Sequence, residues 1–235
     1  MNDPQNPSPA PQDPKTISYL TMRRIVGILG IALPLLTTIG YMVFDRHELC
    51  LLTSISAYYY TALGAVFVGT LCMIALFLIA YKGYNAMEDI TFNVAAALSL
   101  SIALFPLNID CNTASCLPCH YSLTILPHPF CGLIHTVAAG TLFFILGYIS
   151  VFFFTKTKHQ NPSPEKLVRN KIYMGLGGTI WGSLLLYLIY LLITQIGHVH
   201  AIESPYTLLV VETICLWAFG ISWLIKGEAI AALND

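Results

Sequence analysis

Apolar residues along the chain gather into six long stretches, which are separated by shorter polar segments. The stretches are 18 to 25 residues long, and about 20 helical residues cross the roughly 30 Å hydrocarbon core of a bilayer. Six such runs in one chain argue against a soluble protein with buried helices. We therefore predict an all-α fold, a polytopic membrane protein built as a six-transmembrane-helix bundle. The predicted spans are Ile25–Phe44, Tyr60–Tyr81, Ile90–Leu107, Gly132–Phe154, Ile172–Ile196 and Tyr206–Ile225.

The composition agrees with this fold class and sets the domain boundaries. Apolar residues make up 56% of the 235 residues and charged residues only 10%, whereas about a quarter of a soluble domain is charged. The opening MNDPQNPSPAPQDPK has no apolar run and five prolines, so it cannot bury enough surface to offset the entropy of ordering. We predict a disordered cytoplasmic tail over 1–22, a transmembrane domain over 23–227 and a short cytoplasmic tail over 228–235.

The distribution of Lys and Arg predicts which way the spans run. Cytoplasmic loops of membrane proteins are enriched in these residues. With the N-terminus in the cytoplasm, only Arg46 of the 11 basic residues falls on the outer side. Both termini are therefore predicted to be cytoplasmic. The basic residues on the cytoplasmic side are then Lys15, Arg23, Arg24, Lys82, Lys156, Lys158, Lys166, Arg169, Lys171 and Lys226.

The extracytoplasmic loop predicted over 108–131 is rich in cysteine and histidine, and three chemistries remain open for it. In an oxidising compartment Cys111 would pair with Cys131, or Cys116 with Cys119. The CxxC spacing is also typical of one half of a tetrahedral zinc site. The same CxxC could instead exchange disulfides, as in quinone-linked thiol oxidases. The disulfide or metal candidates are Cys111, Cys116, Cys119, His120, His128 and Cys131.

Two ionisable residues lie inside predicted spans, close to the outer surface. Glu212 is the seventh residue of its span and His135 the fourth, both counted from the outer end. An ionisable group in lipid is costly and is therefore a functional candidate. A protonated Glu212 that bonds a neighbouring helix would explain the residue without a ligand. The alternative is a ligand or proton site.

Hydroxyl groups reach the same level of the bundle. TSISAYYYT, residues 53–61, enters the second span from outside, and its tyrosines could simply be anchors in the headgroup layer. Because neighbouring helical residues point about 100° apart, at least one of three consecutive tyrosines should face the bundle. We predict an outward-facing polar cavity between the helices, covered by the cysteine loop. Its candidate ligand-binding residues are Ser54, Ser56, Tyr58, Tyr59, Tyr60, Asn108, His135 and Glu212.

Small residues four positions apart predict where helices pack closely. The second span contains Ala65-x-x-x-Gly69, and the fifth contains Gly178-x-x-x-Gly182. Such spacings let two helix backbones approach each other in lipid. We interpret both pairs as packing contacts within the bundle rather than as dimer interfaces.

Four stretches carry a resemblance to known proteins: SISAYYYTALGAVFVGTLC, AYKGYNAMED, SIALFP and ETICLWAFGISWLIKGE. With them the chain resembles an uncharacterised group of bacterial six-span inner-membrane proteins. The resemblance implies the fold and a location in the bacterial inner (plasma) membrane as a multi-pass protein with both termini inside. It implies no activity and no residue roles, and the cysteine loop is not a feature of that group.

A weaker resemblance, to the CREST membrane hydrolases, fails at the residues that bind zinc in that family. The family pattern has a His four residues after an early Ser, but here Ser56 is followed at that spacing by Tyr60. The late His-x-x-x-His element is also missing, since the only close pair is His198-x-His200. We therefore carry over no catalytic roles.

Two hypotheses on function follow from these residues. In the first, the protein binds a small molecule, a proton or a lipid in the outer cavity, as a sensor, transporter or assembly factor. In the second, it is a membrane-embedded enzyme, either a zinc-dependent hydrolase or a quinone-linked thiol oxidase. The cofactor is unknown, with zinc as a candidate, and the partner common to both hypotheses is the lipid bilayer. A nucleic-acid partner is not expected, because the net charge is −1 and there is no basic stripe with interleaved aromatic residues.

Overall fold

The computed structural model describes residues 14–44, 51–109, 128–157, 162–196 and 204–233, and within these ranges every regular element is a helix. The all-α fold class is therefore confirmed. Short 3-10 helices form η1 (Ser56–Tyr60) and η5 (Ala231–Leu233), while π-helical turns η2 (Ile149–Phe153) and η3 (Leu192–Ile196) extend two of the long helices. The long helices are α1 (Pro14–Phe44), α2 (Gly64–Ala80), α3 (Ala86–Leu104), α4 (His128–Tyr148), α5 (Pro164–Leu191) and α6 (Thr207–Lys226).

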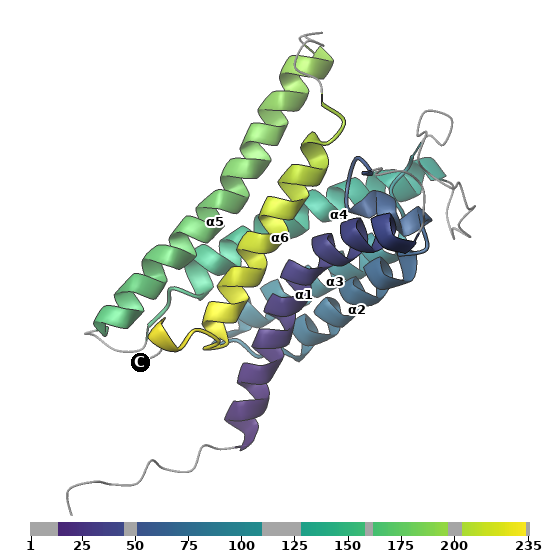
Figure 1. Ribbon diagram of the computed structural model, residues 1–235. Coiled ribbons are helices and arrows are strands. Elements are labelled where there is room, and N and C mark those ends of the chain that lie inside the picture. Colours follow the sequence, from purple (N-terminus) through teal and green to yellow (C-terminus); the bar gives the residue numbers. More distant parts are fainter. Residues whose placement is uncertain (1–13, 45–50, 110–127, 158–161, 197–203, 234–235) are drawn as a thin grey trace, which may run out of the picture.

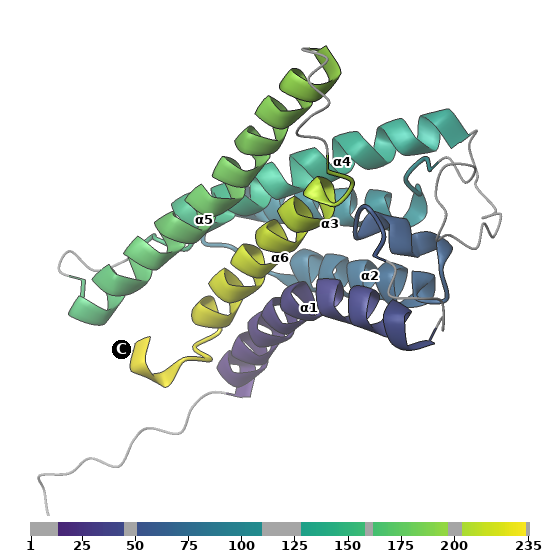
Figure 2. The ribbon, with the colours of Figure 1, turned by 45° about the horizontal axis from the view of Figure 1, so that its top comes forward.

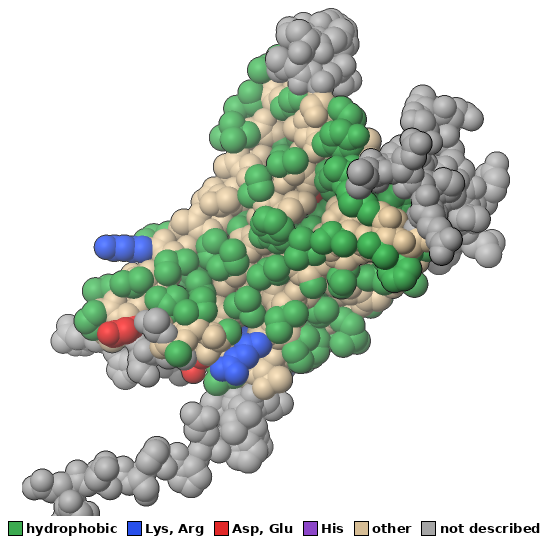
Figure 3. All heavy atoms as spheres, viewed as in Figure 1, with side chains coloured by type: hydrophobic (Ala, Val, Ile, Leu, Met, Phe, Trp, Pro, Cys, Tyr) green, Lys and Arg blue, Asp and Glu red, His purple; other side chains and the backbone are tan. Residues whose placement is uncertain are grey.

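Five of these helices are long and apolar enough to cross a membrane, and α2 is apolar but only 17 residues long. Figure 3 shows the corresponding surface: apolar side chains are spread over the viewed face, and the few visible charged ones lie at its left side and near its lower end. The prediction of a membrane protein is thus supported by five spans. The five spans are Tyr19–Phe44, Ala86–Leu104, Phe130–Phe153, Pro164–Thr194 and Thr207–Lys226.

Three predicted boundaries are wrong. Helix α1 begins at Pro14, so the predicted tail over 1–22 ends inside a helix. Proline is favoured at a first helical position because the N–H that it lacks would have no intrahelical partner there. The second span begins at Gly64 because Tyr60 belongs to η1. The loop predicted over 108–131 ends earlier, because α4 already begins at His128.

Each helix packs against the next one in the chain, and α6 also packs against α1, so the six helices form a closed ring (Figures 1 and 2). Helix α5 packs against α4 and α6 at the edge of this arrangement. Both views also show a bend in α1, which contains Pro34. Proline removes one helical hydrogen bond and bends the helix, and the hydroxyls of Thr37 and Thr38 donate to carbonyls of this turn, those of Leu33 and Pro34 respectively.

Helices α1 and α6 approach each other closely at the point where two glycines face each other. A Cβ on Gly220 would lie 2.6 Å from the carbonyl oxygen of Gly27, and a Cβ on Gly27 would lie 2.7 Å from that of Gly220. Our prediction that Gly69, Gly178 and Gly182 make such contacts is wrong, because a Cβ on any of them would meet nothing within 4 Å. Spacing along one helix does not reveal which face meets a neighbour.

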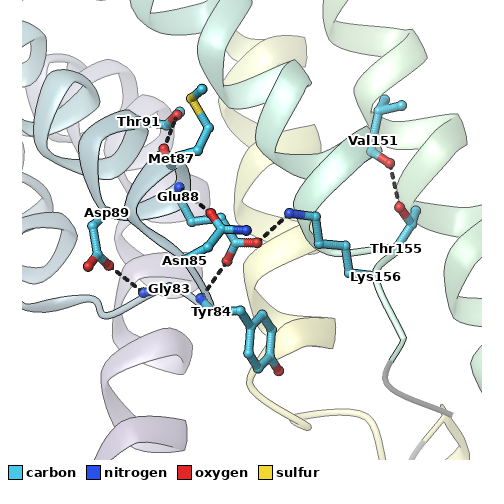
Figure 4. A network of polar contacts seen from close by, with 10 residues as sticks. All are labelled: Gly83, Tyr84, Asn85, Met87, Glu88, Asp89, Thr91, Val151, Thr155 and Lys156. Carbon is cyan, nitrogen blue, oxygen red and sulfur yellow. Dashed lines mark hydrogen bonds and ion pairs between the residues drawn. The ribbon is translucent and has the colours of Figure 1, made fainter.

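A basic network joins the helices at one end of the ring, which we call the basic end. Arg23 of α1 donates to the carbonyl of Lys226 and to the hydroxyl of Tyr81, both at 3.2 Å. In the neighbouring turn, buried Glu88 accepts from Lys156 at 2.6 Å and from the backbone N–H of Tyr84 at 2.9 Å (Figure 4). These contacts fix the ends of α1, α2, α3, α4 and α6 relative to one another.

Candidate functional site

The opposite end of the ring is filled by η1, so we call it the η1 end. Ser54, Ser56 and Tyr58 are all buried there. The segment is held by its neighbours, since the backbone N–H of Leu209 donates to the carbonyl of Thr53 at 3.1 Å. A tight turn then leads into α2, where a Cβ on Gly64 would lie 2.2 Å from the carbonyl oxygen of Tyr59. Buried backbone groups of η1 therefore come within reach of several helices.

Glu212 of α6 accepts a backbone hydrogen bond from the start of η1. Its Oε2 accepts from the backbone N–H of Ile55 at 2.6 Å. The first N–H groups of a helix have no intrahelical partner, so a carboxyl group that accepts from them stabilises the helix end. Glu212 is buried, and this contact accounts for part of the cost of placing it inside the protein.

His135 of α4 joins η1 to α3. Its Nε2 lies 2.8 Å from Oγ of Ser56, and its Nδ1 lies 2.7 Å from the carbonyl oxygen of Phe105. Phe105 ends α3 in an extended conformation, as expected for a residue that precedes proline, here Pro106. Proline thus stops the helix and leaves a carbonyl group near its end for the imidazole to bind.

A cavity extends from this polar group into the ring. The space inside it is about 570 Å³, open surroundings included. Its walls come from α1, η1, α2, α3, α4 and α6, without any residue of α5. Polar side chains are contributed by Ser56, Ser99 and Glu212. The apolar lining residues are Leu33, Ile55, Phe67, Leu71, Ile74, Leu78, Ile102, Ala139, Leu142, Phe143, Leu146, Leu216 and Phe219.

The cavity differs in character from the polar cavity that we predicted. Apolar side chains dominate the wall, and the polar groups lie in a few places. One of them, Ser99 of α3, was not among our candidates; it donates to the carbonyl of Leu71 at 3.0 Å. A serine inside an apolar helix carries no distinctive sequence signal, since such hydroxyls commonly bond backbone carbonyls.

The structure brings three of the predicted ligand-binding residues together and gives the others local contacts. Ser56 bonds His135, while Ser56 and Glu212 both line the cavity. Among the others, the hydroxyls of Ser54 and Tyr58 accept from the N–H groups of Ala57 and Leu52 respectively. The hydroxyl of Tyr60 donates to the carbonyl of Leu107, and the ring of Tyr59 packs against Phe67. Asn108 is exposed beside Gly132.

Most of the cysteine and histidine candidates lie outside the described residues. These are Cys111, Cys116, Cys119 and His120, and the side chain of His128 also belongs to this group. Cys131 is within α4 and is buried. Over the ranges that the structure describes, no cluster of three or more His, Cys, Asp or Glu side chains is arranged to hold a metal ion. The disulfide, zinc and redox interpretations of the loop therefore stay predictions.

Comparison with known proteins adds no relative. The chain matches no protein-family model, and neither the curated proteins nor the solved structures contain a match. The features that bear on function are therefore the cavity and the contacts of Ser56, His135 and Glu212.

Proposed function

We propose that the protein binds a neutral lipid-like molecule, with its apolar chain in the cavity and its headgroup at the η1 end. The observation that carries this proposal is the cavity itself: a mainly apolar space inside the ring, with Ser56 and Glu212 among its lining residues. Small-molecule sites typically combine an apolar wall with a few placed polar groups.

The polar groups select the headgroup. The carboxyl group of Glu212 is an acceptor in the structure, so it favours a headgroup that donates hydrogen bonds and disfavours a second carboxylate or a phosphate. A glycerol headgroup, with hydroxyls that both donate and accept, meets this requirement. A monoacylglycerol or its ether analogue is therefore the type of ligand we propose.

We further propose that the chain spans the bacterial inner membrane six times with both termini in the cytoplasm. The distribution of charge supports this orientation, because Arg23, Lys156 and Lys226 meet at the basic end and basic residues favour the cytoplasmic side. Helix α2 would then be the sixth span, as its length of 17 residues falls at the lower limit for crossing a bilayer. The cavity would open from the η1 end, towards the outer surface.

Photo-crosslinking tests the binding site. The purified protein in detergent micelles would be irradiated with a monoalkylglycerol ether that carries a diazirine in its alkyl chain. We expect crosslinks on cavity residues such as Leu142 and Leu216. The variant Ala139→Phe fills the cavity from α4 and should abolish these crosslinks, because Ala139 is part of the wall.

The variant Val137→Phe is the matched control. Val137 belongs to the same helix but is 59% exposed, so the same added ring meets detergent instead of the cavity and crosslinks should persist. Glu212→Gln keeps an acceptor but adds an N–H₂ group, and it should weaken capture of the glycerol ether. Equal crosslinking of the Ala139 and Val137 variants, or crosslinks confined to exposed residues such as Phe144, would overturn the proposal.

A further inference from the structure

We propose that Ser56 is a nucleophile activated by His135, and that the pair transfers the acyl group of an ester bound in the cavity. This inference depends on the proposed function, because it uses the same cavity and the same type of lipid. The hydroxyl of Ser56 lies 2.8 Å from Nε2 of His135. A serine within hydrogen-bond distance of a histidine that a third group orients is the arrangement used for nucleophilic catalysis.

The third group determines which nitrogen of His135 carries the proton. The carbonyl oxygen of Phe105, 2.7 Å from Nδ1, can only accept a hydrogen bond, so the proton of neutral His135 must be on Nδ1. Nε2 is then the acceptor, and the hydroxyl of Ser56 must donate to it. This is the tautomer that a general base needs, and a backbone carbonyl supplies the orientation that a carboxylate supplies in other serine enzymes.

Burial and access are both suited to this chemistry. His135 is buried, with 2% of its surface exposed, so bulk water does not compete for Nε2. Ser56 lines the apolar cavity, so an ester whose chain occupies the cavity can bring its carbonyl carbon to the serine oxygen. The other cavity serine, Ser99, donates to the backbone carbonyl of Leu71 and has no base as its partner there. The cavity thus presents one activated hydroxyl.

The reaction has an acylation step and a deacylation step. Oγ of Ser56 forms a bond to the ester carbonyl carbon while its proton moves to Nε2 of His135. The ester C–O bond then breaks, and the proton passes from Nε2 to the leaving glycerol oxygen. Water is the second reactant: its oxygen forms a bond to the acyl carbon while its proton moves to Nε2 of His135. The bond between the acyl carbon and Oγ of Ser56 then breaks, and Oγ takes the proton from Nε2. The products are a fatty acid and glycerol, and both residues return to their starting state.

Glu212 sets a condition on this reaction. The negative oxygen that develops on the ester carbonyl needs hydrogen-bond donors. The N–H of Ile55, adjacent to Ser56, is such a donor. Without a ligand, this N–H already donates to the carboxyl group of Glu212. Binding of the ester has to exchange Glu212 for the carbonyl oxygen at this N–H.

A fluorophosphonate probe tests the assignment directly, since it reacts covalently with activated serines. We would treat the full-length protein in detergent micelles and locate the adduct by peptide mass spectrometry, with release of fatty acid from a monoacylglycerol as the second readout. We expect an adduct on Ser56 that Ser56→Ala abolishes. His135→Gln should slow its formation at least about a hundredfold, the usual contribution of a general base. Ser150→Ala is the control: Ser150 is equally buried but donates to the carbonyl of Tyr173, so labelling should be unchanged.

Crosslinking of the monoalkylglycerol ether, which cannot be hydrolysed, separates this inference from binding. Parent protein that captures the ether but forms no adduct on Ser56 would overturn the activity and leave the binding proposal standing. An adduct on Ser56 without capture of the ether would overturn the binding proposal instead. A His135→Gln variant that captures the ether and labels at the parent rate would show that His135 is not the base, which also overturns the inference.

Discussion

Replacing Gly220 by alanine should destabilise the bundle, because it forces α1 and α6 apart where the ring closes. The new Cβ would lie 2.6 Å from the carbonyl oxygen of Gly27 and 3.0 Å from the backbone N of Ile31. Carbon and oxygen atoms in close helix contacts normally approach to about 3.3–3.6 Å. The obstacle is backbone, which cannot rotate away as a side chain can, so α1 itself has to move by roughly 0.7–1 Å.

Overpacking of this kind costs about 1–3 kcal/mol. For a chain of this size, about 2 kcal/mol corresponds to a fall of about 4–8 °C in the midpoint of thermal unfolding. The assay is thermal unfolding in detergent, followed by intrinsic tryptophan fluorescence. Trp223 of α6 is buried among aromatic rings, so its emission should respond when the ring opens.

Gly178→Ala is the matched control for this substitution. A Cβ at Gly178 meets nothing within 4 Å, and alanine is the better helix former by up to about 1 kcal/mol, so the midpoint should stay constant or rise. Gly27→Ala should reproduce the loss seen for Gly220→Ala, because its Cβ meets the same interface from the other side. Equal midpoints for the Gly220 and Gly178 variants would refute the close packing of α1 on α6.

Two further predictions concern the basic end and the orientation. Arg23→Gln removes donors from the carbonyl of Lys226 and the hydroxyl of Tyr81, and it should lower the free energy of unfolding by about 1–3 kcal/mol; no change would show that the network contributes nothing to stability. On bacterial spheroplasts, a membrane-impermeant maleimide should label Ser204→Cys above the parent chain and leave Glu165→Cys unlabelled. The reverse pattern would invert the topology.

The apolar runs predicted where the helices lie along the chain, because length and hydropathy alone determine which segments can lie in lipid. Counting residues from the span ends also brought His135 and Glu212 to the same level as Ser56, and the structure places these three residues at the η1 end. Their contacts could not be predicted in the same way. Glu212 and Ile55 are 157 positions apart, and no local pattern specifies a hydrogen bond over that distance.

The errors in the sequence interpretation have physical causes. The run of tyrosines at 58–60 looks like the start of a transmembrane helix, but it forms a separate 3-10 helix that ends before Gly64. Hydropathy averaged over about 19 residues does not resolve this break, since the polar η1 is only five residues long and adjoins an apolar helix. The glycine pair at Gly178 and Gly182 has the spacing of a packing motif, yet it lies on an open face, whereas Gly27 and Gly220 pack closely without a partner glycine four residues away on their own helices.

The contact between Glu212 and η1 has a consequence for biogenesis. Glu212 follows Ile55 by 157 positions, so the N–H of Ile55 gains this acceptor only after α6 has been synthesised. Unpaired backbone groups in an apolar environment are costly, and an assembly intermediate therefore keeps η1 hydrated or unfolded. Glu212, Leu216 and Phe219 of α6 line the cavity, so the cavity is complete only when α6 docks.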